Sequence, residues 1–81
     1  MEQYSTIIGM DLGDKLNHFC TLDNAGDVIA QGTVACTETA LRHFFAHQPT
    51  SLVAMETGTH SPWISRLAES LGHTVLVANA R

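Results

Sequence analysis

Positively charged side chains are scarce in this sequence of 81 residues. Four lysines and arginines stand against eight aspartates and glutamates, which gives a formal net charge of −4. A free-standing nucleic-acid-binding domain carries a basic stripe or patch, and this sequence contains no such pattern. Either the protein does not bind nucleic acid, or the basic surface belongs to another part of a longer protein.

The sequence also lacks long apolar runs and closely spaced cysteines. No run approaches the roughly 20 residues that span a bilayer, and the first residues, MEQYST, have neither the basic nor the apolar region of a signal peptide. Cys20 and Cys36 lie in apolar segments without a CxxC spacing, which favours free buried thiols over a disulfide. We therefore expect a cytoplasmic protein with no membrane partner.

The composition that remains is typical of a folded domain. Hydrophobic residues make up 44% of the chain and charged residues 15%, and there is no low-complexity tract. This length allows one domain with a modest core. We expect residues 1–81 to form a single α/β unit.

Three extended segments are predicted in the first half of the chain. Residues 5–11, STIIGMD, are nearly continuously apolar, as expected for a strand covered on both faces. Residues 17–23 and 27–34 flank the turn sequence NAG and predict a hairpin. Because the connection LGDKL is short, the first strand can pair antiparallel with the second, which gives a three-stranded meander.

Two helices and two further strands are predicted in the second half. An amphipathic stretch after Thr37 predicts a helix over 38–47, and the apolar run SLVAME predicts a strand over 51–56. The sequence SPW starts a second amphipathic helix over 61–71, which a glycine then stops. The run HTVLVA predicts a final strand over 73–78.

The order of these elements brings two acidic residues together. The first helix can return the chain so that strand 51–56 lies parallel to strand 5–11, and Asp11 and Glu56 then end neighbouring strands at the ligand-binding edge of an α/β sheet. Taken singly, each acid is a common solvated residue at a strand end. Facing carboxylates repel unless one of them takes up a proton or a cation lies between them. We predict that the pair binds Mg²⁺ or Mn²⁺ for phosphate chemistry.

The sequence also resembles a known family. The segment IIGMDLGDKLNHFCTLD, followed in order by METGTHSPW, LGH and VANAR, closely resembles the N-terminal part of IS110-type transposases over essentially the whole chain. The resemblance implies a RuvC-like, ribonuclease-H-like domain, with a mixed sheet built from an antiparallel meander and a parallel β-α-β-α-β unit that is incomplete at its C-terminus. It implies that Asp11 and Glu56 are the first two catalytic acids of a DEDD set that binds Mg²⁺.

The same resemblance implies a DNA-transposition enzyme of which one part is missing. In the family, two further aspartates and a serine proposed to attack DNA lie later in the polypeptide, whereas this sequence stops at Arg81, directly behind an apolar strand. We therefore expect a truncated strand-cleavage and transfer domain that holds a metal weakly and does not cut or join DNA alone. The expected partners are insertion-sequence DNA, a structured guide RNA and further copies in a homo-oligomer.

Several residues near the predicted sheet edge are candidates for nucleic-acid contact. Thr57 and Thr59 can donate hydrogen bonds beside a helix N-terminus, or serve as ordinary loop hydroxyls. His60 can contact a substrate phosphate, or instead cap the helix or pack in the loop. Arg81, like Asn79, follows the last strand at the same edge and can contact nucleic acid, or belong to a disordered tail.

Four other residues are given structural roles. Asp14 is expected to bond its own backbone in a tight turn, with auxiliary metal ligation as the alternative. Trp63 begins an apolar helix face and is expected in the core. His43 and His47 share a helix face at a spacing used in zinc sites, but no third ligand is near in sequence and we expect them to be solvated.

Two other functions fit parts of the pattern. The order of elements is similar to that of the first subdomain of actin- or sugar-kinase-like ATPases, in which a DxG turn surrounds the ATP phosphates. DLGDKLN matches that turn only in part, and this interpretation gives Glu56 no comparable role. A non-catalytic assembly module is the other alternative, in which an uncovered sheet face or the last strand pairs two copies.

Overall fold

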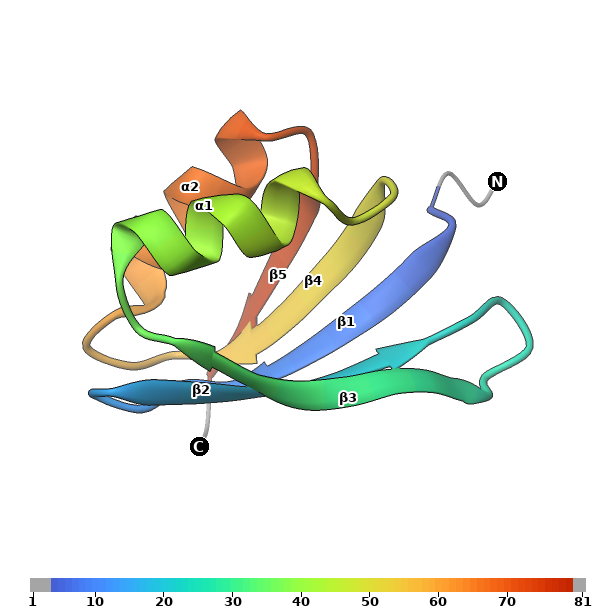
Figure 1. Ribbon diagram of the computed structural model, residues 1–81, viewed down its shortest axis with the longest axis horizontal. Coiled ribbons are helices and arrows are strands. Elements are labelled where there is room, and N and C mark those ends of the chain that lie inside the picture. The colour runs from blue at the N-terminus through green and yellow to red at the C-terminus, as the bar shows by residue number, and fades with distance from the viewer. Residues whose placement is uncertain (1–3, 80–81) are drawn as a thin grey trace.

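The computed structural model describes residues 4–79, which form a five-stranded mixed sheet and two helices (Figure 1). The elements follow one another along the chain as β1 (Thr6–Asp11), β2 (Leu16–Leu22), β3 (Val28–Ala35), α1 (Glu38–Ala46), β4 (Ser51–Glu56), α2 (Ser61–Ser70) and β5 (Thr74–Ala78). The expected α/β class and order of elements are confirmed. The observed bounds differ from the expected ones by at most one residue at either end.

The sheet has the strand order β3-β2-β1-β4-β5. β1 pairs antiparallel with β2, and β2 with β3, so the predicted meander is present. β1 pairs parallel with β4, and β4 with β5. Because β1 and β4 are parallel neighbours, their carboxyl ends meet at the same edge of the sheet.

A single carboxylate organises the turn between β2 and β3. Asp23 Oδ1 accepts hydrogen bonds from the backbone N–H groups of Ala25, at 2.9 Å, and Asp27, at 3.0 Å. Gly26 has a φ of 89°, a conformation that glycine adopts without steric cost. The NAG sequence therefore forms the turn that its residue types predict.

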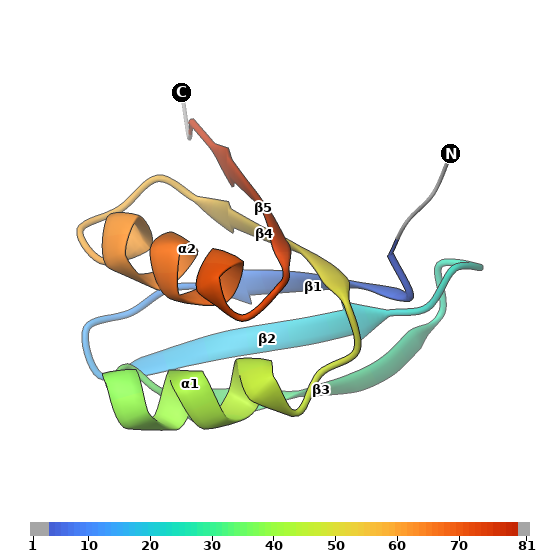
Figure 2. The same cartoon turned by 90° about the horizontal axis from the view of Figure 1, so that it is seen from above.

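Both helices cover the same face of the sheet, as Figures 1 and 2 show from two directions. At the start of α1, Thr37 Oγ1 accepts a hydrogen bond of 3.2 Å from the backbone N–H of Ala40, which is the expected N-terminal cap. α2 begins instead with Pro62 in its first turn, and Gly72, with a φ of 95°, follows its end.

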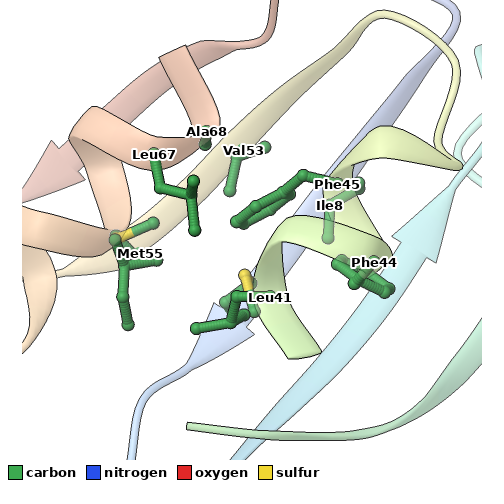
Figure 3. Close-up of a cluster of buried hydrophobic side chains, with 10 residues drawn as sticks. Ile8, Leu41, Phe44, Phe45, Val53, Met55, Leu67 and Ala68 are labelled. Carbon is green, nitrogen blue, oxygen red and sulfur yellow. The ribbon is translucent and has the colours of Figure 1, made fainter. Parts of the chain in front are cut away.

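The core lies between the helices and the covered sheet face. In Figure 3, Leu67 and Ala68 of α2 lie over Val53 of β4, and Phe45 of α1 lies beside Ile8 of β1. The buried apolar residues are Ile8, Met10, Leu41, Phe44, Phe45, Val53, Met55, Ile64, Leu67 and Ala68. Their removal from water is the main favourable contribution to the stability of this arrangement.

The second face of the sheet is bare of helices within residues 4–79 (Figure 1). Burial therefore alternates along β1, and Ile7 is 39% exposed. The expectation that the first strand is covered on both faces is wrong for the described residues, because α1 and α2 pack on the same side. Neither of these two helices is long and apolar enough to cross a membrane.

Candidate functional site

Asp11 and Glu56 are the last residues of β1 and β4, and the sheet register brings them side by side. Met10 and Met55 are paired in the parallel register, and both are buried toward the helices. Because side chains alternate along a strand, the next residue on each strand points to the uncovered face, and adjacent strands lie about 4.8 Å apart. The two carboxylates are both exposed and line the same hollow of about 410 Å³.

No basic side chain neutralises this pair within residues 4–79. Neither carboxylate makes a hydrogen bond or ion pair with another described residue, whereas Arg42, on the covered side, forms an ion pair of 2.6 Å with Glu38. Two adjacent carboxylates without a counter-charge attract a cation. The donor set consists of oxygen atoms, which suits Mg²⁺.

A tight loop holds the backbone that follows Asp11. The backbone N–H of Gly13 donates a hydrogen bond of 3.1 Å to Oδ1 of the buried Asn17. A Cβ atom at Gly13 would lie 2.5 Å from the backbone oxygen of Leu16, so the loop has no room for a side chain there. Asn17, rather than Asp14, therefore bonds the backbone of this turn, and the role expected for Asp14 is wrong.

A second loop, after Glu56, is tied to β5 and to the start of α2. The backbone N–H of Thr57 donates to the backbone oxygen of Ala78 at 2.8 Å, and the Thr57 hydroxyl donates to the same oxygen at 3.1 Å. Ser61 Oγ accepts from the backbone N–H of Gly58 and donates to its carbonyl oxygen. The Thr57 hydroxyl thus serves the fold, and Thr59 is exposed in the loop.

His60 occupies the N-cap position of α2 but forms no capping bond with its side chain. Its Nδ1 atom accepts a hydrogen bond of 3.0 Å from the indole N–H of Trp63, and its Nε2 atom lies 3.3 Å from Oδ1 of Asp14. Of the roles considered for His60, packing in the loop is the one that these contacts match. Trp63 is partly buried against the core, as expected, and in addition directs His60.

His18 is a residue near the site that sequence reasoning did not single out. It is the antiparallel register partner of Asp11, and it lines, with Asp11 and Glu56, a second hollow of about 730 Å³ on the uncovered sheet face. The predicted meander specifies that the first two strands pair, but not which residues of the two strands lie opposite each other. That register depends on where the turn after Asp11 begins and ends. With those bounds known, the sequence would have placed His18 opposite Asp11.

The remaining candidates are two cysteines, two histidines and the last residues of the chain. Cys20 and Cys36 are free thiols that are half-buried rather than fully buried. His43 on α1 and His47 at the C-terminal cap of α1 are exposed, and their tilted rings lie with centroids 4.2 Å apart. Arg81 lies outside the described residues, and Asn79 is exposed after β5.

The donor set at the edge therefore consists of two carboxylates. Within residues 4–79, no three histidine, cysteine, aspartate or glutamate side chains are grouped closely enough to hold a metal ion together. Two carboxylates completed by water and phosphate oxygens are the usual protein contribution to a Mg²⁺ site. The residues present thus fit a single hard cation with a largely open coordination shell.

No protein-family model and no curated protein matches this chain.

Proposed function

We propose that this chain is part of a ribonuclease-H-like, RuvC-like catalytic domain for metal-dependent DNA cleavage and strand transfer, of the IS110 transposase type. One observation carries the proposal: Asp11 and Glu56 end adjacent parallel strands in the order β3-β2-β1-β4-β5, with no counter-charge among residues 4–79. The ordered motifs METGTHSPW, LGH and VANAR support the assignment to this family.

In this proposal, Asp11 and Glu56 ligate Mg²⁺ or Mn²⁺, which would polarise the scissile phosphate and favour its attack by an oxygen nucleophile. Their side chains leave the sheet on the uncovered face, where a phosphate backbone has access to them. A two-metal centre needs about four carboxylates, and these two supply half of that number. We therefore expect the 81-residue chain to bind metal without cleaving DNA.

The proposed partners are insertion-sequence DNA, a guide RNA and further copies of the protein. With four lysines and arginines in the sequence, the chain offers few charges for phosphate contacts. Contacts that provide affinity for nucleic acid are therefore expected from other parts of the assembly, and this chain is expected to supply acids to the reaction centre.

The experiment is a titration with Mn²⁺ and Mg²⁺ followed by amide NMR. Paramagnetic broadening by Mn²⁺ should centre on residues 11–14 and 56–60, and Mg²⁺ should compete it away. Asp11→Asn and Glu56→Gln should each weaken binding at least about tenfold, because each removes half of the protein ligands, and a tenfold change corresponds to about 1.4 kcal/mol.

Glu69→Gln is the matched control, because it removes the same charge from an exposed position near the end of α2. Equal losses of metal affinity in Glu69→Gln and Asp11→Asn would show only a general attraction of cations by an acidic surface and would refute the metal site.

A titration with ATP distinguishes the proposed function from the ATPase alternative. That alternative needs free amides in the turn after β1, where the Gly13 N–H is already bonded to Asn17.

A further inference from the structure

A chain of side-chain contacts joins the two loops that follow the acid-bearing strands. The indole N–H of Trp63 donates to Nδ1 of His60 at 3.0 Å, and Nε2 of His60 lies 3.3 Å from Oδ1 of Asp14. Asp14 lies in the loop after Asp11, and His60 ends the loop after Glu56. The contacts therefore cross from one loop to the other at the edge of the sheet that carries the pair.

The hydrogen bond from Trp63 determines the form of the imidazole. An indole N–H can only donate, so Nδ1 of His60 is an acceptor and carries no proton. The ring proton is then on Nε2, the atom that faces the carboxylate of Asp14. Because Trp63 packs against the core, the orientation of the histidine is fixed from the helix side.

The contact between His60 and Asp14 contributes little to stability by itself. The Asp14 side chain is 93% exposed and that of His60 is 28% exposed, and a polar contact this close to water is worth little. Its main consequence is geometric. The contact links the short β1–β2 loop, which follows Asp11, to the start of α2, which the loop after Glu56 leads into.

We infer that Trp63, His60 and Asp14 form a positioning relay that keeps the loops after Asp11 and Glu56, and with them the two carboxylates, in one relative position. This inference rests on the proposed metal site. His60 and Asp14 do not touch the metal ion in this arrangement, because Nε2 of the imidazole faces the Asp14 carboxylate at 3.3 Å. The relay acts on the acids only through the backbone of the two loops.

Two substitutions of His60 separate positioning from simple support of the helix. In His60→Gln, the amide N–H lies near the former Nε2 position and keeps a polar group facing Asp14. In His60→Asn, the amide oxygen lies near the former Nδ1 position and can still accept from Trp63, but the side chain is too short to reach Asp14. Neither substitution changes the net charge of the neutral imidazole form.

The measurement is the dissociation constant for Mn²⁺ in the full chain, together with the amide spectrum and the indole N–H resonance of Trp63, the single tryptophan. Loss of groups that contact metal ligands typically costs 10- to 100-fold in affinity. Since the relay acts one step further away and through a solvent-exposed contact, His60→Ala should weaken binding about two- to fivefold. His60→Gln should retain more affinity than His60→Asn. His43→Ala, an exposed histidine on α1, should leave binding unchanged.

The outcomes are distinct for the relay and for the metal site. Equal affinity of the parent chain and His60→Ala would overturn the relay, as would a better rescue by His60→Asn than by His60→Gln. If the parent chain binds no Mn²⁺, the proposed function fails. The relay is then tested by comparing the amide resonances of residues 11–14 in the parent chain and in His60→Ala. Movement of those resonances in His60→Ala would support coupling between the loops, and unchanged resonances would overturn it.

Discussion

Asp11 lies directly opposite His18 in the antiparallel pairing of β1 with β2, and both side chains line the hollow on the uncovered sheet face. Directly opposite residues on one face of an antiparallel pair have Cβ atoms about 5 Å apart. An imidazole thus accompanies one member of the acid pair. The next pair on this face is Gly9 with Cys20, and both residues line the same hollow.

The first prediction concerns the role of His18. Replacing it by glutamine should leave Mg²⁺ affinity within about twofold of the parent, because Mg²⁺ takes oxygen ligands. The described residues also contain no three-residue ligand cluster that includes this histidine. Calorimetric titration with Mg²⁺ checks this, with Asp11→Asn as the variant expected to lose affinity. A tenfold loss in His18→Gln would instead make the imidazole a ligand.

The second prediction separates the glycines that follow the two acids. Gly13→Ala should destabilise the fold by roughly 1–3 kcal/mol, because the new Cβ would meet the Leu16 carbonyl oxygen and the loop would have to shift. Gly58→Ala meets no atom within 4 Å and should change stability by less than about 1 kcal/mol. Urea unfolding of both variants gives the comparison. Similar losses at the two positions would show that the close approach at Gly13 is not the cause.

The third prediction concerns a buried histidine that ties three elements together. His73 accepts a hydrogen bond of 3.2 Å from the backbone N–H of Ser51 at Nδ1, and its Nε2 contacts the backbone oxygen of Phe45 at 2.8 Å. His73→Phe should leave both backbone groups unsatisfied and cost roughly 2–4 kcal/mol of unfolding free energy. His43→Phe, on the exposed surface of α1, is the control and should change stability by less than about 0.5 kcal/mol.

The fourth prediction tests which face of the sheet carries the stability of the described residues. Ile64 of α2 is fully buried, and Ile64→Ala should cost about 2–5 kcal/mol. Leu76 of β5 is 55% exposed, and Leu76→Ala should cost less than about 0.5 kcal/mol. Both free energies come from urea unfolding at one protein concentration. A large loss in Leu76→Ala would show that the uncovered face is packed against another surface in solution.

Much of the fold could be predicted from local patterns. The NAG turn, the Thr37 cap and the apolar faces of both helices depend on residues close together in sequence, and each is present where expected. The parallel return of the chain beside β1 followed from the order of elements. The acid pair could be predicted for the same reason, because it requires only that Asp11 and Glu56 end neighbouring parallel strands.

The details of the two loops could not be predicted in this way. Asp14 was expected to bond its own backbone, yet Asn17 takes that role and Asp14 faces His60. Both outcomes satisfy the same local preferences. The choice depends on where α2 places His60 and on the indole of Trp63 behind it.

The sequence by itself determined the elements, their order and the pairing of Asp11 with Glu56, because hydrophobic periodicity and turn chemistry act over a few residues and few chain paths are compatible with them. The tertiary structure alone decided that both helices cover one face, that His18 lies opposite Asp11, and that Trp63 directs His60 toward Asp14. These relationships join residues from different elements. Their geometry is set by register and by packing against the core, neither of which a local pattern specifies.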